Sequence, residues 1–165
     1  MKCFDKRVVK AVISKQEVKG FKHRVCEKRG HSQTDIESYI QSPKPKSGLD
    51  FLAYLHELGH CKSKQPNFYS AVNCNKVVDC QYLKCTRYAW NNDRIICEYN
   101  AWKWALKFYR RLGFNLTKKH KEMIQGYFGN YCFFAENTQV AEKYAKMLND
   151  SFNIGVRADK YNEGY

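Results

Sequence analysis

The spacing of apolar residues predicts helices over much of the second half of the chain. Residues 49–61 and 94–113 carry apolar side chains every three or four positions, the period of a helix with one buried face. Thr117 can cap a further helix that runs to about Phe128, and residues 138–149 repeat the same period. These segments predict four helices that pack through their apolar faces.

The first part of the chain has a different pattern, which predicts short strands. Residues 7–14 are rich in β-branched side chains, and residues 18–27 follow them closely, so the two segments predict a hairpin. Thr34 or Asp35 can cap a short helix that ends at Ile40. The Pro and Gly content of residues 42–48 predicts a loop, and Ser47 or Asp50 then begins the helix of residues 49–61.

A group of polar residues stands out on that helix, because it has the H-E-x-x-H arrangement. His56 and His60 are four residues apart, so both imidazoles project from one helix face and can share a metal ion. Glu57 lies off this axis and is free to act as a general base. Gly59 is unfavourable inside a helix, which indicates that another backbone approaches it closely. The alternative is an amphipathic helix with ordinary surface or core histidines.

A zinc site needs a third protein ligand, and Glu98 is the best candidate. It lies on the predicted helix of residues 94–113, where Ala101 and Ala105 share its face and allow a neighbouring helix to approach. The helix has Arg110 and Arg111 in its last turn and ends at Gly113. The alternative for Glu98 is a helix carboxylate that pairs with a Lys or Arg.

Together these residues resemble the gluzincin type of zincin metallopeptidases, including the small ImmA/IrrE-like proteases of bacteria and phages. The likeness covers about residues 47–113. It implies His56, His60 and Glu98 as zinc ligands, Glu57 as the general base, and hydrolysis of an intracellular protein or peptide. One departure is Trp102, which stands where many gluzincins have an acid that orients a ligand histidine.

The chain length favours one α+β domain in which a short antiparallel sheet precedes the active-site helix and further packed helices. Residues 1–46 hold the strands and short helix, residues 47–113 the two ligand helices, and residues 114–165 the last helices and a tail that frays beyond Ile154. Residues 62–92 are irregular, with a short helix or strand near residues 77–88. In the family that the chain resembles, a strand at the sheet edge pairs with substrate, and residues 7–14 and 18–27 are the candidates.

The net charge of +13 comes from 29 lysines and arginines against 16 aspartates and glutamates. The basic residues are spread along the chain, which favours a solvated surface that attracts anionic partners. Nucleic acid is a conceivable partner, although no nucleic-acid-binding motif is present. A membrane is not expected, because no apolar stretch is long enough to span one, and we expect a cytoplasmic protein, in the host cytoplasm if the chain is viral.

The eight cysteines are expected to be reduced, since the helical patterns do not suit a small disulfide scaffold. Cys61, Cys74, Cys80 and Cys85 could bind a second metal, but they lack close C-x-x-C pairs. Cys97 is interpreted as a core residue.

Three functions therefore stay open. The first is a zinc metallopeptidase, and the second is a zincin-fold binding or inhibitor module with weak or no activity, in keeping with Trp102. The third is a basic nucleic-acid-associated protein in which the H-E-x-x-H helix is incidental. His120, Tyr127 and Tyr131 are candidate donors to a developing oxyanion, and none of them is assigned.

Overall fold

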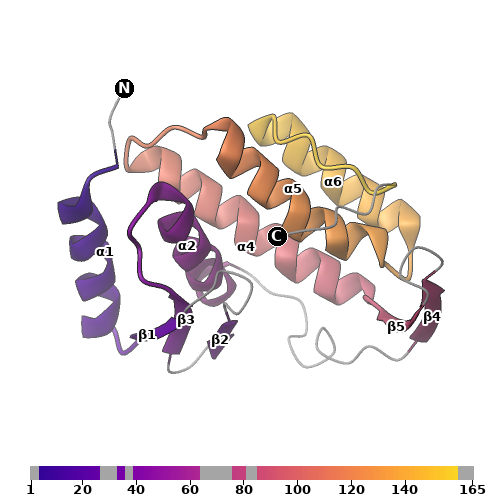
Figure 1. Cartoon of the computed structure of the whole chain (residues 1–165), viewed down its shortest axis with the longest axis horizontal. Helices are drawn as coiled ribbons and strands as arrows, with labels where there is room; N and C mark the ends of the chain where they lie inside the picture. The colour runs from indigo at the N-terminus through magenta and orange to yellow at the C-terminus, as the bar shows by residue number, and fades with distance from the viewer. Residues whose placement is uncertain (1–3, 27–32, 36–38, 64–75, 81–84, 160–165) are drawn as a thin grey trace. The chain divides into compact units, whose positions relative to one another are not determined.

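The computed structural model describes residues 4–26, 33–35, 39–63, 76–80 and 85–159. Within these residues it contains five helices and five strands (Figure 1). In chain order they are α1 (Lys6–Val18), β1 (Lys22–Cys26), β2 (Gln33–Asp35), β3 (Tyr39–Pro43), α2 (Gly48–Lys62), β4 (Lys76–Cys80), β5 (Cys85–Ala89), α4 (Asn92–Arg111), α5 (Lys118–Phe133) and α6 (Thr138–Phe152). The prediction of an α+β fold is confirmed.

Helix α1 replaces the predicted strand of residues 7–14, so that prediction was wrong. Asp5 caps the helix, since its carboxylate accepts a hydrogen bond from the Arg7 backbone N–H at 2.8 Å. Val9, Val12 and Gln16 are buried on one face. The β-branched residues fit a helix here because their three- and four-residue spacing lets one face pack, and this packing outweighs their strand propensity.

The N-terminal sheet is mixed, whereas an antiparallel hairpin was predicted. Its strand order is β1-β3-β2, in which β1 pairs parallel to β3 and β2 pairs antiparallel to β3. β1 lies within the predicted strand of residues 18–27, but its partner is β3 and not the segment before it. The short helix predicted up to Ile40 is also wrong, because residues 33–35 and Ile40 belong to strands. The predicted loop of residues 42–48 is shorter, since β3 includes Ser42 and Pro43.

Helix α2 begins where the sequence predicted. The Ser47 hydroxyl accepts a hydrogen bond from the Asp50 N–H, and the Asp50 carboxylate accepts one from the Ser47 N–H, which is a capping box. Each of residues 51–60 is buried. One side of α2 packs against the sheet, chiefly on β3. The helix is therefore a fully packed element, which fixes the backbone from which His56 and His60 project.

The C-terminal helices follow the sequence prediction with shifted ends. Helix α5 runs to Phe133, beyond the predicted Phe128, and Thr117 caps it by accepting a hydrogen bond from the His120 N–H. Helix α6 is capped by Asn137 and runs three residues past the predicted end. The prediction that the tail frays beyond Ile154 is wrong for Val156, which is buried as Ile154 is, and residues 160–165 lie outside the described residues. The burial of Val156 is supported by Asn149, which hydrogen-bonds both of its backbone groups.

The chain divides into two compact units, one formed by Met1–Lys64 and Asn100–His120, the other by Gln65–Tyr99 and Lys121–Tyr165. The boundary falls inside α4, which is a continuous helix. The first unit contains α1, the mixed sheet and α2. In the second, β4 and β5 form an antiparallel pair and α5 packs with α6. The single-domain prediction stays a prediction. Among the described helices, none is both long and apolar enough to cross a membrane.

Candidate metal centre

His56 and His60 are held in a geometry that suits one shared ion. Their Nε2 atoms are 3.2 Å apart, both residues are buried, and their rings meet edge to face. Two nitrogens bound to one tetrahedral zinc at about 2.05 Å lie about 3.3 Å from each other. The two imidazoles therefore already have nearly the spacing of a pair of zinc ligands.

Helix α2 packs closely against α4 at Gly59. A Cβ atom on Gly59 would lie only 2.5 Å from the backbone oxygen of Ala101, so only glycine allows this approach. One residue further along α4, the Trp102 ring lies 4.1 Å from the His56 ring, centroid to centroid. The prediction that another backbone approaches Gly59 is confirmed, and the approaching group is the Ala101 carbonyl.

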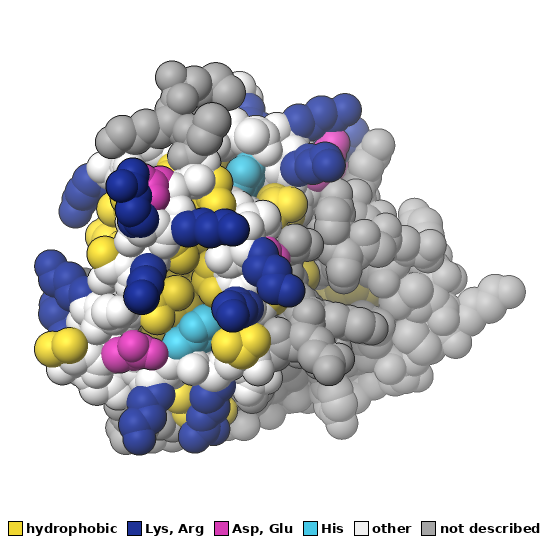
Figure 2. All heavy atoms as spheres, turned by 60° about the vertical axis from the view of Figure 1, so that its left-hand side comes forward, with side chains coloured by type: hydrophobic (Ala, Val, Ile, Leu, Met, Phe, Trp, Pro, Cys, Tyr) yellow, Lys and Arg dark blue, Asp and Glu magenta, His cyan; other side chains and the backbone are white. Residues whose placement is uncertain are grey.

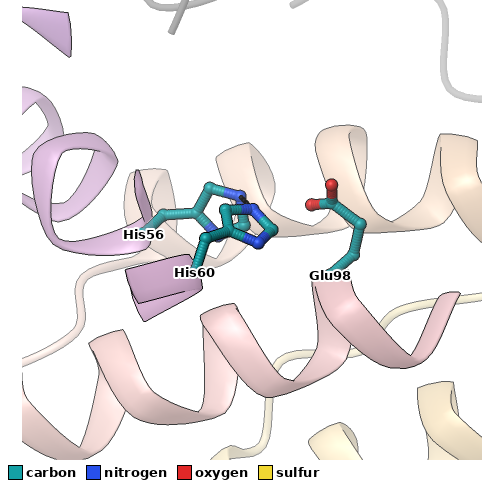
Figure 3. Close-up of side chains that lie close together, drawn as sticks. All are labelled: His56, His60 and Glu98. Carbon is teal, nitrogen blue, oxygen red and sulfur yellow. Dashed lines mark hydrogen bonds between the residues drawn. The ribbon is translucent and has the colours of Figure 1, made fainter. Parts of the chain in front are cut away.

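Glu98 precedes Trp102 by one turn of the same continuous helix. Its side chain therefore lies on the same face of α4 as Trp102, the face that contacts His56. The carboxylate is 2% exposed. One ligand atom from each of His56, His60 and Glu98 can be chosen so that all three lie within 4.8 Å of one another. Figure 3 shows the two imidazoles and the carboxylate directed toward a common region. The structure therefore brings together the three residues that the sequence singled out.

The donor set fits a zinc ion in number and type. Two imidazoles and one carboxylate leave a fourth tetrahedral position open, which is the pattern of catalytic sites. Ligand atoms around a bound zinc lie about 3.4 Å apart, so the carboxylate has to move inward by no more than about 1.5 Å. Glu57 is buried and is not one of the three grouped residues, and its role as general base stays a prediction. The role of the three residues as metal ligands stays a prediction.

Arg94 is the main electrostatic neighbour of Glu98, and sequence reasoning did not identify it. Its Nη2 lies 3.0 Å from Glu98 Oε1 and donates a hydrogen bond to the Tyr131 hydroxyl at 3.1 Å. The guanidinium also lies over the rings of Trp90 and Tyr131. Burial lowers the pKa of Arg94, but the negative charge of Glu98 and the Tyr131 hydroxyl outweigh it and raise that pKa above its ordinary value. Arg94 is therefore a fixed positive charge beside the candidate ligand.

The alternative role considered for Glu98, pairing with a basic residue, is thus also present. The four-residue spacing of Arg94 and Glu98 was the available signal. A carboxylate has two oxygens, so pairing of one with Arg94 does not prevent the other from binding a metal.

Trp102 provides a different support for His56 from the acid that the family likeness implies. Its ring contacts the His56 ring at an angle of 30°. Its indole Nε1 is buried and has no hydrogen-bond partner in the structure. Trp102 therefore restricts the orientation of His56 by packing, whereas a carboxylate would accept a hydrogen bond from the imidazole.

The candidate oxyanion donors lie in other surroundings. The His120 Nε2 faces the Tyr109 hydroxyl at 3.1 Å, and its Nδ1 lies 2.6 Å from the Thr117 hydroxyl. Both His120 and Tyr109 lie close to Gly48, at the N-terminal end of α2 and two turns before His56. His120, on α5, therefore contacts α4 through Tyr109 and lies close to the start of α2. The Tyr131 hydroxyl accepts its hydrogen bond from Arg94.

The described cysteines have structural surroundings. Burial raises the pKa of the Cys97 thiol to about 11, which keeps it protonated and unreactive near neutral pH. Cys61 is half-buried, and its Sγ contacts the Glu57 carbonyl. Cys74 and the side chains of Cys80 and Cys85 lie outside the described residues, so the second metal site stays a prediction.

Comparison with family models, curated proteins and solved structures gave no match for this chain.

Proposed function

We propose that this protein is a zinc-dependent metallopeptidase that hydrolyses peptide bonds of a cytoplasmic protein. The observation that carries the proposal is the buried group of His56, His60 and Glu98, whose ligand atoms lie within 4.8 Å of one another. The two histidines come from α2, and Glu98 comes from α4, more than thirty positions later in the sequence. Burying two imidazoles and a carboxylate together has a desolvation cost, and a shared cation would offset it.

In this mechanism His56, His60 and Glu98 hold the ion, and Glu57 moves the proton. When bound, zinc supplies a Lewis acid that polarises a carbonyl and lowers the pKa of water. Glu57 accepts the proton of the attacking water and later delivers it to the leaving amine nitrogen. Arg94 and Trp102 act on the ligands, because they contact Glu98 and His56 respectively.

An extended peptide is the substrate form that the sheet can accept. Among the described residues, β1 and β2 are the outer strands of the sheet, and each has one edge with no described strand paired to it. A peptide can add to such an edge through main-chain hydrogen bonds. Residues 7–14 are not a candidate for the substrate-pairing strand, because they are helical. Residues 18–27 stay a candidate, because they contain β1. β2 is the other candidate, since α2 packs against it as well as against β3.

Two single variants test the proposal. His56→Ala should abolish stoichiometric zinc binding, whereas His23→Ala, which changes a histidine outside the group, should leave it intact. Glu57→Gln should retain zinc and lose proteolysis, measured as new N-termini in a cell lysate incubated with purified protein. Zinc binding that survives His56→Ala would contradict the metal site.

A catalytically weak binding module is the second candidate, and the packing of Trp102 on His56 favours it. No acid follows Glu98 by four residues, so the hydrogen bond that strengthens a ligand histidine must be absent or come from another group. This alternative predicts that wild type and Glu57→Gln act equally in every functional assay.

A further inference from the structure

The positive charge of the protein is concentrated in one of its two units. Among the described residues of the unit formed by Met1–Lys64 and Asn100–His120, sixteen are Lys or Arg and five are Asp or Glu. Among those of the other unit, seven are basic and eight are acidic. Charge asymmetry of this size indicates an anionic partner for the basic unit. It contrasts with the even spread of basic residues along the sequence.

Within the basic unit, α4 carries an ordered row of cations. Lys103, Lys107, Arg110 and Arg111 follow the i, i+4, i+7, i+8 spacing of one helix face, and we call them the α4 basic stripe. The last three are exposed and Lys103 is half-buried. The buried residues of this half of α4 occupy the opposite face, namely Ala101, Trp102, Ala105, Leu106 and Tyr109. The stripe therefore faces away from the core of its unit.

No acidic residue interrupts this region. Residues 100–120 contain six Lys and Arg and no Asp or Glu, and they include the exposed Lys118 and Lys119 at the start of α5. Every charged residue of the C-terminal half of α4 and of the first three residues of α5 is therefore a cation. Nothing in this segment itself repels a polyanion.

Two aromatic residues border the stripe. Trp104 and Phe108 are half-buried, and their rings stack at 5.0 Å with 10° between the planes. On α4 they project beside the stripe, between its exposed face and the buried face. Cations that follow a backbone, next to aromatic rings that can stack on bases, are the combination found in proteins that bind single-stranded nucleic acid. An acidic polypeptide would use the cations but would gain nothing from the rings.

We propose that the α4 basic stripe binds the phosphate backbone of single-stranded nucleic acid, with Trp104 and Phe108 beside the bases. The site lies in the basic unit and does not depend on zinc. It adds a binding function to the proposed peptidase, and either can fail without the other.

Fluorescence anisotropy of a labelled 20-nucleotide single strand tests the proposal. We compare Lys107→Gln/Arg110→Gln/Arg111→Gln with Lys6→Gln/Arg7→Gln/Lys10→Gln, which removes the same charge from exposed positions of α1. Figure 2 shows that the side of the molecule bearing α1 also carries many Lys and Arg side chains, so it is a demanding control. The α4 variant should bind about tenfold or more weakly, and its slope of log K against log salt should become shallower by about 2. The α1 variant should bind nearly as wild type.

Several outcomes overturn the proposal. Equal losses in both triple variants would mean that overall charge drives binding. No measurable binding by wild type, equal binding of duplex, or equal competition by polyglutamate would each exclude the proposed ligand. Trp104→Leu should weaken binding to the single strand with no change in the salt slope, because it removes stacking and no phosphate contact. Folding of each variant is checked by circular dichroism and by its urea denaturation midpoint, neither of which depends on zinc binding.

Discussion

Two residues that contact candidate ligands, Arg94 and Trp102, support them in chemically different ways. Arg94 gives Glu98 a charged partner, whereas Trp102 gives His56 an apolar one. Arg94 is itself fixed by the Tyr131 hydroxyl and by the rings of Trp90 and Tyr131. Glu98, a candidate ligand, is therefore held by a fixed charged group, whereas His56, the other, is held at its Trp102 side by ring packing.

The first prediction concerns Arg94, which we expect to position the Glu98 carboxylate. Arg94→Met removes the partner of one carboxylate oxygen and should weaken zinc binding about 10- to 100-fold. Competition with a chromophoric chelator measures this affinity.

Lys146→Met is the matched control, because Lys146 and Asp150 form an exposed ion pair with the same four-residue spacing. It should leave zinc affinity unchanged. Tighter zinc binding by Arg94→Met would show that Arg94 competes with the metal for Glu98, which is contrary to our interpretation.

Sequence alone located the residues of the candidate site but not their neighbours. The H-E-x-x-H motif is local, and Glu98 could be chosen because a helical period with two alanines placed it on a packing face. Arg94 was missed because four-residue ion pairs are common on exposed helices, and only the fold shows that Glu98 is buried and Arg94 half-buried.

At the scale of elements, the contact between α2 and α4 depends on a single missing side chain. Gly59→Ala places a Cβ 2.5 Å from the Ala101 carbonyl oxygen, and backbone cannot rotate away as a side chain can. We expect a loss of about 1–3 kcal/mol in the free energy of unfolding from overpacking. This loss should appear even though alanine is favoured in a helix by about 1 kcal/mol.

Urea denaturation of Gly59→Ala and Gly48→Ala checks this expectation. A Cβ on Gly48 meets only side-chain atoms, the Tyr109 hydroxyl and the His120 ring, which can shift. Gly48→Ala should therefore cost less. Equal stability of Gly59→Ala and wild type would mean that α2 and α4 separate easily.

The junction of β1, β3 and α2 should depend on pH through His23. Its Nε2 lies 2.9 Å from the Ser42 hydroxyl on β3, and its ring meets Tyr54 of α2 edge-on. Burial lowers the pKa of His23 below its usual 6.5, with smaller opposing contributions from Ser42 and Glu17. The unfolded chain then binds more protons than the folded chain in the window just below pH 6.5, so stability falls as pH falls through that window.

Thermal melts of wild type and His23→Gln between pH 5 and 8 test this sign. The difference in stability between the two proteins should be constant above about pH 7 and shift in favour of His23→Gln as the pH falls below 6.5. A difference that does not change with pH would show that His23 titrates equally in the folded and unfolded chains.

The elements that were predicted wrongly show two ways in which tertiary packing overrides a local signal. Residues 7–14 contain many β-branched side chains, but Val9 and Val12 lie three apart and bury one face of α1. Ile40 was assigned to a helix from a cap signal, whereas its pairing with His23 and Thr34 of the neighbouring strands makes it part of a sheet. The long segments from α2 onward were predicted well because each contains its own helical signal, whereas no local pattern links β1 to β3, its partner seventeen residues later.

At the scale of the whole molecule, we expect the proposed ion to stabilise the folded chain as well as to take part in catalysis. His56 and His60 belong to α2 and Glu98 to α4, so a bound ion would link two helices. Binding to the folded chain alone adds about 2.7 kcal/mol of stability when free zinc is 100 times its Kd. For a chain of this length each kcal/mol shifts Tm by about 2–4 °C, so zinc should raise Tm by about 5–10 °C.

Differential scanning calorimetry with excess zinc, and after removal of zinc with EDTA, measures this shift. His56→Ala should melt at the same temperature under both conditions, because it lacks one of the three ligands. Glu57→Gln should respond to zinc as wild type does, since Glu57 lies outside the grouped ligands. A zinc-dependent shift in Glu57→Gln that vanishes in His56→Ala separates the metal site from the chemistry. If wild type melts at one temperature with and without zinc, the folded chain holds no ion, and the buried His-His-Glu group is stabilised by contacts within the protein such as the Arg94–Glu98 pair.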